Sequence, residues 1–311
     1  MIATRSLVLL AGLSPWVAGC RETPQAKAAQ VHSVEAERKQ TLARRLALAD
    51  ANPTKPVPVA QWIMPPELRE ISGLALTSRG TVLTHDDNVG RVYEIDPKTG
   101  ILLKGFSLAG GVRGDFEAIT IAGSDVFLMR SNGKIYKFKE GPDGSQVPYT
   151  VYDTGLGKEC EFESMAYEAD SSRLILACKK FLQKKAPKEV LIFHVPLPLG
   201  DRSAITAMHI DIKDVIGSNK WTNFHPSDIN IDPFTKNYVI VGSKEAGLIE
   251  VTPDGEVVRS QPLPGEHRQA EGIAITPDSI LLVSDEANVK PPAITLYRWR
   301  PDAPQTNAAA K

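Results

Sequence analysis

A short pattern recurs five times in this chain of 311 residues: a serine or a glutamate opens a stretch in which apolar residues alternate with others. The five stretches read SGLAL, EAITI, ESMAY, SDINI and EGIAI, and their first residues, the strand heads, are Ser72, Glu117, Glu163, Ser227 and Glu271. Successive strand heads are separated by 45, 46, 64 and 44 residues. A period of this length is typical of the blades of a β-propeller.

Each strand head is followed by a turn and by further apolar runs. The second runs are TVLTH, VFLMR, LILAC, YVIVG and ILLVS, and a third run follows each of them. A fourth run is visible in most repeats but is missing from the last one. Short alternating runs separated by turn residues predict antiparallel strands, and four strands per repeat predict a propeller blade. The alternative is a β-sandwich of hairpins, which would not usually repeat the same head residue and strand order.

The ends of the repeat array predict how the ring closes. The segment 57–65 (VPVAQWIMP) precedes the first repeat and has no other strand to pair with, so we expect it to complete the last blade and remove an open sheet edge. The predicted fold is an all-β, five-bladed β-propeller of four-stranded antiparallel blades over 57–303, closed by this N-terminal strand. The long spacing predicts an extra loop or helix over 214–226, and 304–311 is expected to be a disordered tail.

The first residues have the pattern of an export sequence. Arg5 is followed by an apolar run over 7–19, which ends in small residues directly before Cys20. This arrangement resembles the lipobox of bacterial lipoproteins and predicts a lipoprotein-type signal peptide over 1–19, with lipidation of Cys20. The expected partner is then a membrane, either the cell membrane or the outer membrane, with the protein facing the periplasm. The alternatives are an ordinary signal peptide and an uncleaved anchor.

Residues 20–56 are expected to form a lipid-anchored tether. The stretch 33–51 is rich in Ala, Leu, Lys and Arg, which favours a helix. Leu42 and Leu46 provide only a thin apolar stripe, so a solvated spacer helix is favoured over a helix that packs against a partner. The proline-containing segment 52–58 is expected to break the helix.

Charge and cysteine content limit the possible functions. The formal net charge is −1 and charged residues make up 23% of the chain, so nucleic-acid binding is not expected. A monomer is expected. Besides Cys20, the chain contains only Cys160 and Cys178, which flank one expected hairpin. An exported protein permits a disulfide between them, and two free thiols are equally compatible with the sequence.

The strand heads are also the candidate functional site. In a propeller the first strand of each blade lines the central channel, so Glu117, Glu163 and Glu271 should converge near one mouth. Ser72 and Ser227 would complete the ring. Three close carboxylates repel one another, so either their pKa values rise or a cation neutralises them. Oxygen ligands without His or Cys favour a hard divalent ion such as Ca²⁺.

A salt-bridge network is the alternative to a metal. The expected hairpin register places Arg130 across from Glu117. Lys179, Lys244 and Arg268 are the candidate partners of the other two glutamates. The spacing alone favours neither the metal nor the salt bridges.

The chain from about Trp62 to Trp299 contains the segments EISGLAL, THDDN, RVYEID, DFEAITI, EFESMAY, AGLIEVTPDGEVV, QAEGIAI and LLVSDEAN. Together they resemble the SdiA-regulated, or YjiK-like, family of bacterial exported proteins. Asp285 and Ala287 depart from the Ser-Glu-Pro-Asn pattern that is usual in that family. The resemblance implies a five-bladed β-propeller, distantly similar to NHL repeats, with a bound calcium ion.

The same resemblance strengthens the expectation of calcium mainly at Glu117, Glu163 and Glu271. Assisting ligands are expected from the set Ser72, Ser227, Asp228 and Glu286.

Two functions are compatible with these features. The favoured one is a calcium-binding scaffold tethered to the envelope, with an unidentified small-molecule or protein ligand on the propeller face. It is favoured because the chain has no GxSxG motif, no HExxH motif and no Gly-rich phosphate loop. The alternative is a calcium-dependent hydrolase at the channel mouth, either a phytase-like phosphoesterase or a lactonase-like enzyme. The groups that would bind phosphate or transfer protons in such an enzyme are Arg130, Lys179, Lys180, Lys244, His85 and His225.

Overall fold

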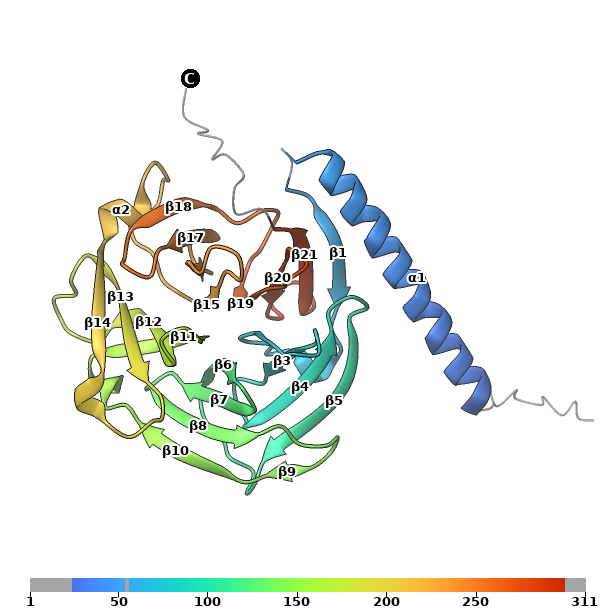
Figure 1. Ribbon diagram of the computed structural model, residues 1–311, viewed down its shortest axis with the longest axis horizontal. Helices are drawn as coiled ribbons and strands as arrows, with labels where there is room; N and C mark the ends of the chain where they lie inside the picture. Colours follow the sequence, from blue (N-terminus) through green and yellow to red (C-terminus); the bar gives the residue numbers. More distant parts are fainter. Residues whose placement is uncertain (1–23, 54–55, 300–311) are drawn as a thin grey trace, which may run out of the picture.

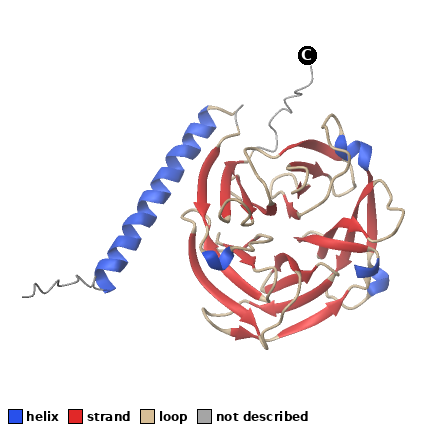
Figure 2. Ribbon diagram, turned by 180° about the vertical axis from the view of Figure 1, so that it is seen from behind, coloured by secondary structure: helices blue, strands red, loops and turns tan. Residues whose placement is uncertain are grey.

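The computed structural model describes residues 24–53 and 56–299, which form a ring of five β-sheets with one long helix beside it (Figure 1). The expected signal peptide over 1–19, Cys20 and the expected tail over 304–311 lie outside the described residues. Each sheet is one blade (Figure 2). In four blades the strands lie side by side in chain order, and in the fifth the outermost strand comes from the N-terminal side of the chain. The prediction of an all-β, five-bladed propeller is confirmed.

The bounds of the strands show how regular the repeat is. The first blade contains β2 (Ala75–Leu76), β3 (Val82–His85), β4 (Arg91–Asp96) and β5 (Ile101–Leu108). The second contains β6 (Phe116–Ala122), β7 (Asp125–Arg130), β8 (Lys134–Lys139) and β10 (Tyr149–Asp153). The third contains β11 (Cys160–Glu168), β12 (Arg173–Phe181), β13 (Glu189–Pro196) and β14 (Thr206–Asp211). The fourth contains β15 (Asp228–Ile231), β16 (Tyr238–Gly242), β17 (Gly247–Val251) and β18 (Val257–Pro262). The fifth contains β19 (Ala270–Ile275), β20 (Ile280–Asp285), β21 (Ala293–Arg298) and β1 (Pro58–Ile63).

The first blade differs from the predicted four strands. A short strand from the second repeat, β9 (Gln146–Val147), pairs in parallel with β5, so this sheet has five strands. In the described part of the chain, three short 3₁₀ helices lie in the connections: η1 (Pro66–Leu68), η2 (Leu156–Lys158) and η3 (Arg202–Ala204).

The N-terminal strand closes the ring as predicted. β1 pairs antiparallel with β21, from Pro58 opposite Tyr297 to Ile63 opposite Ala293. The last blade therefore combines strands from both ends of the described chain, and its outer edge comes from the N-terminal side.

The core of the molecule consists of one apolar layer at each interface between neighbouring blades. β16 illustrates how one strand serves two layers. Tyr238 and Ile240 pack into the layer shared with the third blade, while Val239 and Val241 pack into the layer shared with the fifth. Because successive side chains of a strand point to opposite faces, a strand between two layers must be apolar on both. This explains its continuous run YVIVG.

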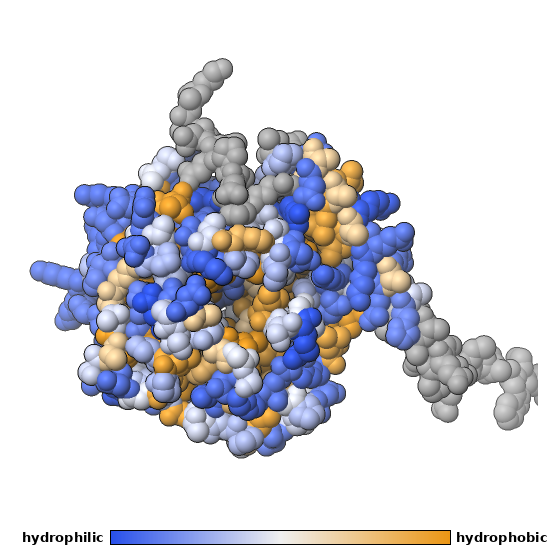
Figure 3. Space-filling model, in the orientation of Figure 1, coloured by the Kyte–Doolittle hydropathy of each residue, from blue (hydrophilic) through white to orange (hydrophobic). Residues whose placement is uncertain are grey.

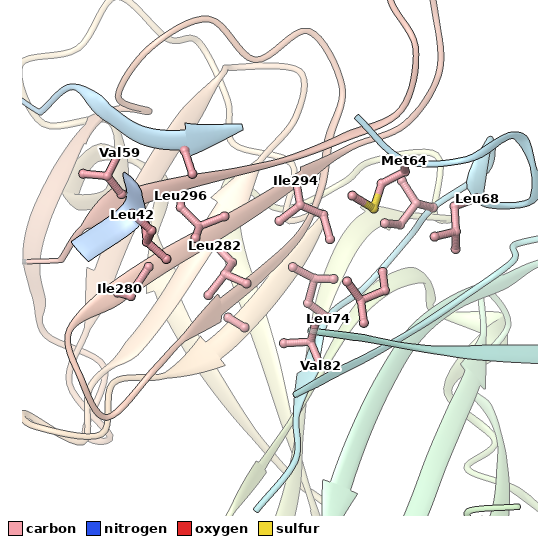
Figure 4. Packing of buried hydrophobic residues seen from close by; sticks show 14 of the residues in the cluster. Leu42, Val59, Met64, Leu68, Leu74, Val82, Ile280, Leu282, Ile294 and Leu296 are labelled. Carbon is pink, nitrogen blue, oxygen red and sulfur yellow. The ribbon is translucent and has the colours of Figure 1, made fainter. Parts of the chain in front are cut away.

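The helix α1 (Pro24–Ala51) begins earlier than the predicted residue 33 and ends at the predicted residue 51. The expectation that it is a solvated spacer is wrong. Leu42 is 3% exposed and packs in one apolar cluster with Val59 of β1 and Leu296 of β21 (Figure 4). A narrow stripe is sufficient here because the helix lies along the edge of one blade instead of entering a core.

Polar contacts also hold α1 against the propeller. Arg38 donates a hydrogen bond of 2.5 Å to the carbonyl oxygen of Thr99, and Arg298 pairs with Asp50 at 2.8 Å. Within the described residues, no helix is both long enough and apolar enough to span a bilayer.

The long fourth repeat and the cysteine pair also have defined structures. The excursion predicted over 214–226 overlaps the short helix α2 (Ile212–Ile216), whose N-cap Asp211 accepts a hydrogen bond from the backbone of Lys213. Cys160 and Cys178 form a disulfide between β11 and β12, which decides between the two alternatives that the sequence left open.

Replacing Leu42 by Ala tests the docking of α1. We expect the free energy of unfolding to fall by about 2 kcal/mol, because a buried Leu side chain is removed. The matched control is Leu48→Ala on the same helix, since Leu48 is 59% exposed. This control should change the free energy by less than about 0.5 kcal/mol. Urea unfolding measures both values, and equal effects of the two variants would contradict the docked helix.

Candidate functional site

The inner strands of the five blades contact one another around the axis, and an acidic cavity of about 150 Å³ lies at their heads. Six carboxylates line it: Glu70, Asp87, Glu117, Glu163, Glu271 and Glu286. Within the described part of the chain, one basic residue, Lys179, lines the same cavity. The predicted convergence of the strand-head glutamates is therefore present in the structure.

Each of the three strand-head glutamates sits at a β-bulge. The pairing of β6 with β7 skips Glu117, that of β11 with β12 skips Glu163, and that of β19 with β20 skips Glu271. A bulge leaves the extra residue without a cross-strand partner and re-aims its side chain. The three bulges occur at the same position of three blades, so they direct three carboxylates to one place.

Five of the seven residues predicted to hold a metal line the cavity. They are Ser72, Glu117, Glu163, Glu271 and Glu286. The other two, Ser227 and Asp228, are buried but do not line it.

Ser227 and Asp228 instead connect blades. The Ser227 hydroxyl donates a 2.7 Å hydrogen bond to the carbonyl oxygen of Ala270. Asp228 accepts hydrogen bonds from three backbone N–H groups, on its own blade and on the fifth and first blades: Ile229 at 2.8 Å, Ile273 at 2.7 Å and Leu74 at 3.4 Å. Burial raises the pKa of Asp228 well above its ordinary value.

Burial and neighbouring negative charge raise the pKa values of four of the cavity carboxylates. Burial, followed by the charge of Asp115, raises the pKa of Glu117 to about 9. Burial also raises the pKa of Glu271, against the charge of Lys179 and a hydrogen bond from Ser243.

The same effect acts on the loops that border the cavity. Burial and a hydrogen bond with Glu70 raise the pKa of Glu286 to about 8. Burial and the charge of Glu70 raise the pKa of Asp87 to about 6. Carboxylates in this situation are stabilised by protons or by a cation.

The salt bridges differ from those predicted. Lys179 pairs with Glu163, as expected. The predicted pairing of Arg130 with Glu117 is wrong, because the bulge shifts the register and Arg130 faces Phe116 instead. The Arg130 guanidinium lies over the rings of Phe116 and Tyr136, at 5.1 and 5.3 Å, and donates to the carbonyl oxygen of Arg113.

Lys244 and Arg268, the other predicted partners, form no salt bridge with any described residue. The lysine on β12 is therefore the basic group that the structure brings to the glutamates.

The chemistry of the cavity fits a hard cation, although its side chains do not form a closed coordination shell. Among the residues described, no three His, Cys, Asp or Glu side chains are grouped closely enough to hold a metal as they stand. However, the donors that line the cavity are mostly carboxylate oxygens, the ligands that calcium takes. The side chain of Glu163 is 9% exposed, and its Oε2 atom has no hydrogen-bond partner. An orphaned buried carboxylate oxygen is an acceptor that a cation can satisfy.

Neither predicted proton-transfer histidine lies at the cavity. His85 is fully buried, and its Nδ1–H donates to the carbonyl oxygen of Asp86 at 3.2 Å. His225 is held by Glu245, which accepts from the histidine backbone at 3.0 Å and contacts its Nδ1 atom at 2.8 Å.

Two polar lining residues that sequence reasoning missed share one feature. Glu70 and Gln269 each precede a strand head by two positions. Gln269 donates a hydrogen bond to Glu286. Their common offset from a strand head was the one sequence feature that pointed to them.

No protein-family model and no curated protein matches the chain. Among solved structures, the glutaminyl cyclase of Myxococcus xanthus aligns with a TM-score of 0.54 and 11% identity over 78% of this chain and 95% of that one. A luciferin-regenerating enzyme aligns with a TM-score of 0.49 and 10% identity over 79% of this chain and 97% of that one. The PQQ-bound aldose sugar dehydrogenase of Streptomyces coelicolor aligns with a TM-score of 0.48 and 13% identity over 76% of this chain and 98% of that one. At these identities the likeness concerns the fold alone. The alignment with the glutaminyl cyclase supports the β-propeller fold.

Fold and site together define the chain as a five-bladed β-propeller with an acidic cavity at one mouth of its central channel.

Replacing Asp228 by Ala should weaken the joint between three blades. We expect a loss of about 3 kcal/mol in the free energy of unfolding, because three buried backbone N–H groups lose their acceptor. Asp254→Ala, in an exposed turn, is the control and should have an effect below about 0.5 kcal/mol. Thermal and urea unfolding measure the difference. Similar values for the two variants would show that Asp228 does not join the blades.

Burial of His85 should make the protein sensitive to mild acid. Burial lowers its pKa in the folded state from 6.5 to about 4, so below pH 6.5 the unfolded chain binds a proton that the folded chain does not. Stability from this group is therefore lost between pH 6.5 and pH 4, by about 3 kcal/mol in total. The raised carboxyl pKa values act in the opposite direction, so the comparison must be made against His85→Gln. This variant should lose clearly less stability between pH 7 and pH 4.5 in urea titrations, and identical losses would refute the prediction.

Proposed function

We propose that this protein is an exported, lipid-anchored β-propeller of the SdiA-regulated type, which binds calcium at the acidic cavity and acts as a binding scaffold in the cell envelope. The single observation that carries the proposal is the charge imbalance of the cavity, which has six carboxylates and one lysine. A divalent cation would offset part of this excess without protonating the carboxylates.

The residues that would hold the ion come from different blades. Glu117, Glu163 and Glu271 reach the cavity from the second, third and fifth blades, and Ser72 lies at the head of the first. When bound, calcium would supply positive charge and flexible oxygen coordination at the axis. The convergence of the three glutamates does not depend on an ion, because the bulges in the chain direct these side chains to the cavity.

Export is supported by two features. The sequence before residue 21 has the lipobox-like pattern that ends at Cys20. The disulfide between Cys160 and Cys178 is typical of proteins that function in oxidising compartments.

The scaffold is favoured over the hydrolase because the groups that catalysis would need are engaged elsewhere. The buried His85 does not reach the cavity, and Arg130 is stacked on aromatic rings. The second candidate histidine, His225, is paired with Glu245 and does not line the cavity. In the one view that Figure 3 shows, the rim of the molecule is mostly hydrophilic, as a surface that meets solvent or polar ligands would be.

Calorimetric titration of the chain that follows Cys20 tests the proposal, after treatment with a chelator. We expect calcium to bind near one equivalent and magnesium to bind more weakly. Glu163→Gln and Glu271→Gln should each weaken binding by about tenfold or more, since each removes a charged ligand.

Glu161→Gln is the matched control, because Glu161 lies on the same strand as Glu163 but pairs with Lys180 at 3.7 Å outside the cavity. It should bind calcium like the unmodified chain. Absence of calcium binding in the unmodified chain would eliminate the proposed function.

A further inference from the structure

Lys179 is an extra residue in the third blade. In the pairing of β11 with β12, Glu161 lies opposite Lys180 and Phe162 lies opposite Cys178, so Lys179 has no cross-strand partner. Glu163, the next residue on β11 after Phe162, also has no cross-strand partner. The two residues without ladder partners are thus an acid and a base, and they face each other.

The other two glutamate-bearing blades lack this insertion. Their bulges skip Glu117 and Glu271, but the facing strands continue without a gap, through Arg130 and Met129 in one blade and Asp285 and Ser284 in the other. The lysine is therefore not a general requirement of the bulged strand head. It is a feature of one blade only among the described glutamate-bearing blades.

The position of Lys179 gives it influence over the whole cavity. It pairs with Glu163, and its charge also acts on Glu117 and Glu271. Its side chain is 31% exposed, whereas that of Glu163 is 9% exposed. The ammonium group therefore belongs to a partly exposed side chain, which has room to move away from the buried carboxylate.

We infer that Lys179 is a built-in competitor for the cation, and that it determines the selectivity of the cavity for divalent over monovalent ions. This inference rests on the proposed function. A cation that reaches Glu163 must displace the lysine. A monovalent ion that displaces the ammonium group of Lys179 leaves the charge of the cavity unchanged. A divalent ion that displaces it makes the charge of the cavity more positive by one unit.

A purely structural ion pair would behave differently. Loss of such a pair would lower stability by the same amount with and without calcium, and it would leave calcium affinity unchanged or reduced. Affinity and calcium-dependent stability therefore separate the two roles.

The test compares Lys179→Met with the unmodified chain in calcium and sodium titrations, and in thermal unfolding with and without calcium. We expect Lys179→Met to bind calcium about tenfold more tightly or more, because the attached competitor is gone. Its melting temperature should be lower than that of the unmodified chain in chelator and should rise more on addition of calcium. Sodium should interfere with calcium binding more strongly in the variant.

Lys180→Met is the matched control. Lys180 is the next residue on β12, its side chain is 64% exposed, and it pairs with Glu161 outside the cavity. This control should match the unmodified chain in affinity and in the calcium-induced rise of the melting temperature.

The outcomes separate the inference from the proposed function. Calcium binding that is equal or weaker in Lys179→Met overturns the inference and leaves the proposed function intact. Binding by the variant but not by the unmodified chain supports the competing lysine and overturns calcium binding as the native function. Absence of binding in both overturns both. A variant that folds only with calcium supports the inference, and one that folds in neither condition assigns Lys179 a structural role and overturns it.

Discussion

The antiparallel pairing of β1 with β21 closes the ring, and the arrangement of all five blades depends on it. Every blade contributes apolar side chains to two layers, so an open ring would expose two apolar sheet faces and an unpaired edge. Closure forces the five inner strands toward one axis, where their first residues meet. The acidic cavity is therefore a consequence of the closed ring, and no single blade could form it.

This convergence has an electrostatic cost that the apolar layers offset. Buried carboxylates that repel one another destabilise a fold unless protons or cations accompany them. The raised pKa values of Glu117, Glu271 and Glu286 show that burial and neighbouring charge act on several of them at once. Lys179 is the chain's own partial compensation. Carboxyl groups with strongly perturbed pKa values that gather in one cavity are typical of functional sites.

Periodicity predicted the blades because strand heads recur at blade spacing, and it predicted the closing strand because no other partner was available. It also predicted that three glutamates converge. It could not predict how they are aimed, since one bulge moves the register by a residue and takes Arg130 away from its expected partner. The role of Glu70 as a lining residue could not be predicted because Glu70 lies outside the alternating runs. The docking of α1 could not be predicted because a thin apolar stripe around Leu42 is compatible both with a solvated helix and with a helix that lies along a sheet edge.

Because α1 is docked, it is a poor flexible linker. Its 28 residues span about 42 Å, which is comparable to the diameter of a small domain. Cys20 stands four positions before the first residue of the helix. A lipid on Cys20, as proposed, would precede a helix whose second half, from Arg38 to Asp50, is held against the propeller. The docked half of the helix could not serve as a flexible tether, so the freedom of the propeller relative to the bilayer would depend on the residues before Arg38.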